Sequence, residues 1–158
     1  MAGAQGSALA LAVAAAGGLG SLPCAMLSME ALRSELQALR AGIQGPYSVN
    51  FFCHTPPAPD AARMQRWSAA VRPYHLEMGI DPDTIPAGPG RSPFSAEVAA
   101  LLSEFKPAVV SFHFGLPSAV LLARVKSWGS LVLASATTVE EALWLQEHGA
   151  DAIIAQGL

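Results

Sequence analysis

Five uncharged polar residues stand at or near the ends of short apolar runs in this sequence: Ser21, Asn50, His113, Ser135 and Gln156. Ligands of parallel α/β proteins bind at the carboxyl ends of strands, so these residues are candidates to share one site. Their hydroxyl, amide and imidazole groups suit a neutral, planar ligand rich in nitrogen and oxygen. The sequence has no H-x-x-x-H, H-E-x-x-H or C-x-x-C spacing, so we expect no metal site.

Three of these candidates have two interpretations each. Asn50 lies in "VNFF", where its amide could bind the edge of a ring or satisfy neighbouring backbone groups, and Gln156 has the same two roles open to it. His113 in "SFHFG" shares a strand face with Ser111, because side chains alternate along a strand. It is a candidate acid, base or ligand contact, or a hydrogen-bonded structural histidine.

The elements that must position these residues alternate between helix and strand. We predict strands at 18–22, 47–53, 108–114, 131–135 and 151–156. We predict helices at 7–16, 28–44, 60–73, 94–105, 118–128 and 138–148, the third ending at Pro73 and the last opened by a capping box of Thr138 and Glu141. The tryptophans at 67, 128 and 144 are expected to pack against the sheet.

This alternation predicts an α/β fold with a parallel sheet, because the apolar runs are continuous and rich in Val, Ile, Leu and Phe. Two architectures share the pattern, a doubly wound open sheet and an eight-stranded barrel. No G-x-G-x-x-G or G-x-x-x-x-G-K-[ST] motif supports a nucleotide-binding open sheet. A complete barrel needs about 250 residues, so the pattern alone leaves both open.

Composition excludes several classes of function. The chain has 158 residues, a net charge of −3 and no run of Lys or Arg, which argues against nucleic acid as a partner. The apolar run 8–16 is too short to span a membrane and has no cation before it. Two cysteines fit a reducing, cytoplasmic location. The segment 79–93 is rich in proline and glycine and is expected to be a long loop, either a lid or a surface insertion.

Six motifs in this order resemble the nitronate monooxygenase family, formerly called 2-nitropropane dioxygenases: "MAG", "GGLGSLP", "VNFF", "VVSFHFGLP", "LVLASATTVEEA" and "GADAIIAQG". The resemblance implies an FMN-dependent (β/α)8 TIM barrel that oxidises alkyl nitronates with O2 to a carbonyl compound and nitrite. It also implies that Asn50 and Gln156 contact FMN, that Met1 lies beside the flavin ring, and that His113 and Ser135 face the same pocket.

The resemblance covers strands two to six of such a barrel, so we expect a partial TIM barrel, an incomplete FMN-binding domain over 1–158. The family's catalytic histidine follows the "AQG" motif in a Gly-Gly-His turn, beyond Leu158, and this chain alone is expected to be nearly inactive. Flavin-dependent enoyl-ACP reductases are similar in the sixth strand and are the alternative enzyme. A non-catalytic half-barrel or a truncated gene product is the other alternative, and no oligomeric state follows from the sequence.

Overall fold

The computed structural model describes residues 3–58, 60–85 and 91–157. The chain divides into two units, one made of residues 1–54 and 91–158 and the other of residues 55–90.

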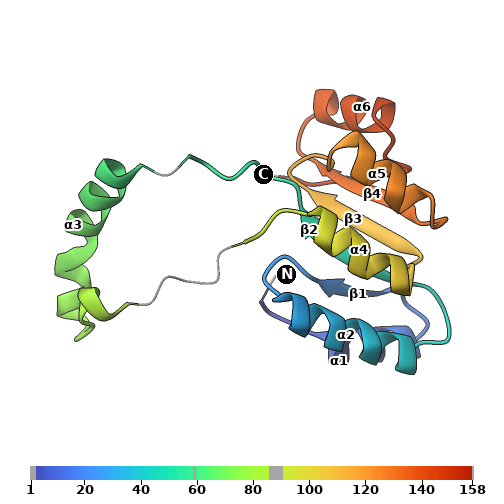
Figure 1. Ribbon diagram of the computed structural model, residues 1–158, viewed down its shortest axis with the longest axis horizontal. Coiled ribbons are helices and arrows are strands. Elements are labelled where there is room, and N and C mark those ends of the chain that lie inside the picture. Colours follow the sequence, from blue (N-terminus) through green and yellow to red (C-terminus); the bar gives the residue numbers. More distant parts are fainter. Residues whose placement is uncertain (1–2, 59, 86–90, 158) are drawn as a thin grey trace. The chain divides into compact units, whose positions relative to one another are not determined.

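The larger unit contains a five-stranded parallel sheet, formed by β1 (Gly20–Pro23), β2 (Tyr47–Phe52), β3 (Val109–His113), β4 (Leu131–Ala136) and β5 (Ala152–Ala155). The strands lie in the order of the sequence, β1-β2-β3-β4-β5 (Figure 1). A doubly wound sheet reverses its strand order at a switch point, and the described strands show no such reversal. The order is therefore that of a barrel segment.

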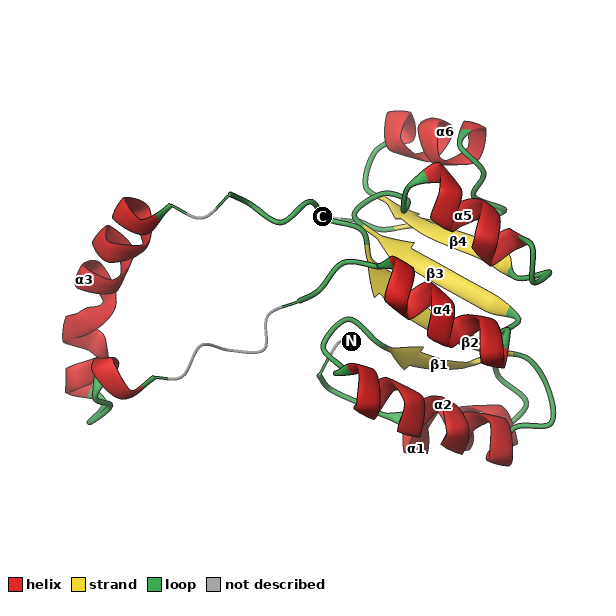
Figure 2. Cartoon of the chain, in the orientation of Figure 1, coloured by secondary structure: helices red, strands yellow, loops and turns green. Residues whose placement is uncertain are grey.

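The helices of this unit are α1 (Ser7–Ala15), α2 (Met29–Gly42), α4 (Ala96–Phe105), α5 (Ala119–Lys126) and α6 (Val139–Glu147). Right-handed crossovers between consecutive parallel strands place their helices on the same face of the sheet, and Figure 2 shows α2, α4 and α5 side by side there. The two faces of β4 differ in exposure accordingly. Val132 and Ala134 on the helix-covered face are fully buried, whereas Leu131 on the other face is 56% exposed. One face of the sheet is thus covered by helices, and the other is open.

Local sequence signals explain where these helices begin and which side they bury. The Ser28 hydroxyl accepts a hydrogen bond from the amide of Ala31 at the start of α2. Leu32, Leu36 and Leu39 of α2 are 2% exposed or less, as their spacing along one helix face requires. The capping box predicted for Thr138 is present at the start of α6 and is confirmed.

The "GGLGS" segment, residues 17–21, joins α1 to β1, and two of its glycines, Gly17 and Gly20, are required for different reasons. Gly17 has a φ of +85° just past the end of α1, in the left-handed region that glycine adopts freely. Gly20 lies so close to α1 that a Cβ atom there would be 2.3 Å from the carbonyl oxygen of Ala10. Glycine at position 20 therefore allows the helix to rest directly on the strand.

The smaller unit contains α3 (Ala61–Glu77) and a short 3-10 helix, η1 (Pro82–Thr84). The prediction that Pro73 ends the helix is wrong. Proline removes one intrahelical hydrogen bond and crowds the carbonyl of the preceding turn, which kinks or breaks a helix. This helix continues past Pro73 to Glu77, with Asp60 capping the amide of Arg63 at its start. Of the segment 79–93 predicted as a loop, residues 86–90 lie outside the described residues and the rest includes η1.

The predicted packing of the tryptophans is correct for one of the three. Trp128 is half-buried and packs against the main core. Trp67 is 64% exposed and Trp144 is 47% exposed, so neither is a core residue. Trp144 stacks on His148 one helical turn later, with ring centroids 4.1 Å apart.

Candidate ligand-binding site

Polar side chains follow the open face of the sheet toward the carboxyl ends of the strands. Asn50 of β2 lies opposite Ser111 of β3 in the strand register. The Asn50 Nδ2 atom donates to the Ser111 hydroxyl at 2.8 Å and to the Ser111 carbonyl oxygen at 3.4 Å. The Ser111 hydroxyl in turn donates to the Val49 carbonyl oxygen at 3.4 Å. These side-chain hydrogen bonds join β2 to β3 in addition to the backbone hydrogen bonds between the two strands.

A second polar contact joins β3 to β4. His113 is the last residue of β3, and its Nε2 atom lies 3.4 Å from the hydroxyl oxygen of Ser135 on β4. Both residues are half-buried, so their polar groups remain accessible from the open face. Polar atoms thus cross three neighbouring strands in a row.

The row borders a cavity of about 670 Å³, a volume within the usual range for small-molecule sites. His113, Ser135 and Gln156 line it, together with Phe114, Trp144 and the first turn of α6. Gln156 is held in place through its backbone, whose amide donates to the Ala136 carbonyl oxygen at 2.9 Å. Its exposed side chain is therefore free to meet a ligand.

The cavity has no positive charge among its described lining residues, which include Glu140 and Glu141. Hydrogen bonds from the backbone amide and hydroxyl of Thr137 lower the pKa of the Glu141 carboxyl, so it is anionic at neutral pH. An anionic wall disfavours a phosphate group. The cavity suits a neutral or cationic part of a ligand.

Aromatic rings form the rim of this site. The rings of Phe52 and Phe114 meet edge to face with centroids 5.1 Å apart, and His54 and His113 each lie within 6.2 Å of both. Phe114 is 65% exposed and has a φ of +65°, a conformation that is strained for a bulky side chain. Strained residues of this kind concentrate at functional sites.

The structure brings His113, Ser135 and Gln156 to one cavity and places Asn50 one strand away, beside Ser111. Ser21 lies on β1 opposite Ser48 and is not among the described residues that line this cavity. Met1, the other remaining candidate, lies outside the described residues. Sequence reasoning did not select Ser111 or Phe114 as site residues. The signal for Ser111 was available, because it stands two positions before His113 and so shares its strand face.

The two cysteines are poor nucleophiles. Burial raises the pKa of the Cys24 thiol far above its usual value, and it raises the pKa of the Cys53 thiol to about 12. Because the thiolate is the reactive form, we assign neither residue a chemical role.

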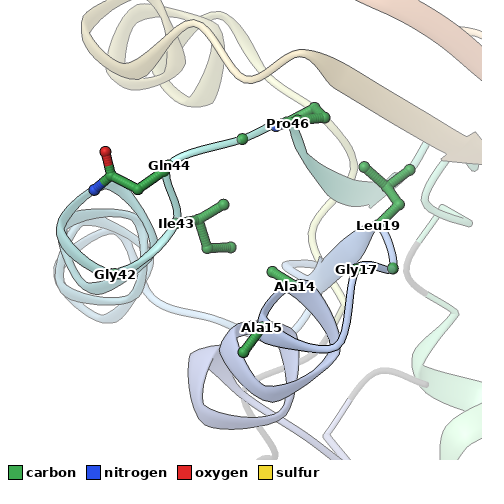
Figure 3. Close-up of a pocket in the computed structure, with 10 residues that line it drawn as sticks. Ala14, Ala15, Gly17, Leu19, Gly42, Ile43, Gln44 and Pro46 are labelled. Atoms are coloured by element: carbon green, nitrogen blue, oxygen red, sulfur yellow. The ribbon is translucent and has the colours of Figure 1, made fainter.

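A second hollow of about 560 Å³ lies at the amino ends of β1 and β2 (Figure 3). Alanine, glycine and apolar residues line it, and Gln44 is the one lining side chain with a polar group. It lies at the opposite end of the strands from the polar row. Among the described residues, no three His, Cys, Asp or Glu side chains gather where they could hold a metal ion.

Consecutive parallel strands in sequence order, with helices on one face, define a segment of an α/β barrel. The family model described as nitronate monooxygenase matches residues 1–158. The chain belongs to the nitronate monooxygenase family, and the predicted family is confirmed.

Named relatives support this assignment. The chain is 42% identical to a nitronate monooxygenase of Paraburkholderia phytofirmans over 160 residues, covering 100% of this chain and 43% of the relative. It is 37% identical to a nitronate monooxygenase of Pseudomonas aeruginosa, covering 100% of this chain and 45% of that relative. The chain therefore spans less than half the length of these relatives.

Solved structures agree on the fold. A nitroalkane oxidase from Streptomyces ansochromogenes matches 100% of this chain and 44% of its own, with a TM-score of 0.82 and 34% identity. FabK from Thermotoga maritima matches 98% of this chain and 38% of its own, with a TM-score of 0.67 and 24% identity, which supports the fold alone. The predicted segment of a TIM barrel is confirmed. None of the helices in the described part of the chain has the length and apolar character of a membrane span.

Proposed function

We propose that this chain forms the ring-binding part of an FMN-dependent enzyme that oxidises alkyl nitronates with O2 to a carbonyl compound and nitrite. The observation that carries the proposal is the row of Asn50, Ser111, His113 and Ser135 across three strand ends of the open face. Membership of the nitronate monooxygenase family over the whole chain supports the substrate class.

The residues present fit the flavin ring better than they fit its phosphate. The polar edge of an isoalloxazine ring carries nitrogen and oxygen atoms that accept or donate hydrogen bonds. Asn50, Ser135 and Gln156 offer uncharged partners of both kinds. The acidic, cation-free lining of the cavity gives a phosphate no partner among its described residues. Bound flavin would supply the oxidation and reduction chemistry, as cofactors do in general.

The other side chains of the site would act on the substrate. The Nε2 atom of His113, beside the Ser135 hydroxyl, can donate a hydrogen bond to a nitronate oxygen or hold a proton there. The half-buried ring of Phe52 and the exposed ring of Phe114 can shield the site from water and contact the alkyl part of the substrate. The proposed partners are therefore small molecules, a nitronate or nitroalkane and O2. The two free cysteines support the proposed cytoplasmic location.

The experiment is a chimera in which this chain replaces the matching 160 residues of the Paraburkholderia phytofirmans relative. We expect the purified chimera to bind FMN, consume O2 with an alkyl nitronate and release nitrite. The chain alone should bind flavin weakly, because the described lining of its cavity offers the phosphate no partner. With little flavin bound, it should show little or no turnover.

The control chimera carries Asn50→Ala, which should reduce flavin content without unfolding the protein. Two results would contradict the proposal. One is a flavin-loaded chimera that oxidises NAD(P)H with an enoyl thioester but is inert toward nitronates, as an enoyl reductase would be. The other is a well-folded chimera that retains no flavin, whereas the unmodified relative does.

A further inference from the structure

The amide group of Asn50 has its orientation fixed by its neighbours. A backbone carbonyl oxygen only accepts hydrogen bonds, so the side-chain atom of Asn50 that lies 3.4 Å from the Ser111 carbonyl oxygen must be the Nδ2 donor. The Ser111 hydroxyl gives its proton to the Val49 carbonyl oxygen. It is therefore left to accept from Asn50 at 2.8 Å. Both contacts require the same orientation of the amide.

The opposite end of this amide faces away from Ser111. No hydrogen bond within the described residues involves the Asn50 Oδ1 atom, although Asn50 is half-buried on the face of the sheet that no helix covers. Ser111 itself is only 6% exposed, so a ligand on this face meets the Asn50 oxygen and not the serine hydroxyl. A carbonyl oxygen without a partner favours a ligand that presents a hydrogen-bond donor, N–H or O–H, to it.

We propose that Ser111 is a positioning residue, which holds Asn50 so that its Oδ1 atom accepts a hydrogen bond from the N3–H group of an oxidised flavin ring. The oxidised isoalloxazine ring has one N–H group, at N3, whereas its other polar ring atoms accept hydrogen bonds. The flavin as ligand rests on the proposed function. The orientation of Asn50 rests on the hydrogen bonds alone.

The test compares lumiflavin with 3-methyllumiflavin, a pair that differs at N3 and has neither ribityl chain nor phosphate. Each is titrated into the 158-residue chain and followed by quenching of flavin fluorescence. We expect the unmodified chain to bind lumiflavin at least about fivefold more tightly, the worth of one ordinary hydrogen bond. In Ser111→Ala the preference should fall below about twofold, and Ser111→Thr, which keeps the hydroxyl, should restore it.

Ser48→Ala is the matched control. Ser48 is also a buried serine on the open face, two residues before Asn50 on β2, at 4% exposure. The same loss of a hydroxyl there should leave the preference unchanged. A chain that binds both flavins equally, or an alanine variant at 111 that keeps the full preference, would overturn the role of Ser111 while leaving flavin binding intact.

A second measurement needs no flavin. In ¹⁵N–¹H spectra of the unliganded chain, the side-chain NH2 protons of Asn50 should exchange with solvent more slowly than those of Gln156, and Ser111→Ala should remove this protection. If no flavin binds to the chain, the proposed flavin site fails, and the exchange measurement then decides the orientation by itself. Equal exchange before and after Ser111→Ala refutes the positioning role.

Discussion

Replacing Gly20 by alanine should destabilise the protein more than the same change at any other described glycine with an ordinary φ. The added Cβ would lie 2.3 Å from the Ala10 carbonyl oxygen, against 3.4 Å or more for ordinary contacts. That oxygen belongs to the backbone of α1, so relief requires the helix to move about 1 Å from β1, an overpacking change that typically costs about 1–3 kcal/mol. Since Ala10 is 1% exposed, we expect the upper end of that range.

Two further glycines provide graded controls. A Cβ at Gly42 would lie 2.4 Å from Cδ2 of Leu11, the end of a flexible side chain that can turn aside. A Cβ at Gly45 would meet nothing within 4 Å, so alanine there should be neutral or stabilise by up to about 1 kcal/mol through the unfolded state. The free energy of unfolding should therefore rank Gly20→Ala lowest, Gly42→Ala next and Gly45→Ala highest.

Urea denaturation followed by circular dichroism measures this ranking. With a slope of about 2 kcal/mol per molar urea, a loss of 3 kcal/mol lowers the midpoint for Gly20→Ala by about 1.5 M. Equal midpoints for the variants at 20 and 45 would refute the close approach of α1 to β1. A lower midpoint for the variant at 45 would have the same consequence.

Three other outcomes follow from the contacts of the larger unit. The hydrogen bond from Lys126 and that from the amide of Val132, both 2.8 Å, lower the pKa of Asp151, so its contribution to stability is complete at neutral pH and is lost as the pH falls below about 4. Asp151→Ala should cost about 1 kcal/mol at pH 7 and should flatten the pH dependence of thermal unfolding between pH 3 and 7; an unchanged profile would contradict this. Cys24 and Cys53 should resist a thiol reagent at pH 8 until urea unfolds the chain, because burial raises both pKa values, and fast labelling of the folded chain would disprove the burial. Amide hydrogen exchange should be faster in β5, which has one neighbouring strand in the described sheet, than in β3, which has two, and equal protection would show that β5 is covered.

Much of the fold could be predicted from local sequence signals. All five strands lie within two residues of their predicted limits, because each is a short apolar run bounded by turn residues. Thr138 and Glu141 predicted the start of α6 because a capping box is a purely local arrangement. The covering of a single face could not be predicted from the strands, since continuous apolar runs occur in barrels and in open sheets alike.

Predictions failed where tertiary packing or the wider environment decides the outcome. Proline inside a helix can either kink the helix or end it, and α3 continues past Pro73 to Glu77. The exposure of Trp67 cannot be derived from residue type, because apolar side chains are common on protein surfaces. The orientation of the Asn50 amide follows from the positions of the Ser111 hydroxyl, the Ser111 carbonyl oxygen and the Val49 carbonyl oxygen. Sequence spacing does not give these positions.

The two faces of the sheet have different roles: one packs against the helices, and the other carries the polar row. On the helix face, Val110, Phe112 and Val132 are fully buried and have no polar groups. On the open face, Leu131 of β4 and Ile154 of β5 are 56% and 39% exposed, on the same side of the sheet as the polar row. In a closed barrel this face points to the interior, so closure would bury these apolar side chains and remove water from the polar strand ends together. Closure of the barrel would then have two consequences. It would bury apolar surface, and it would give the polar strand ends a low dielectric constant, in which hydrogen bonds to a flavin ring are strengthened.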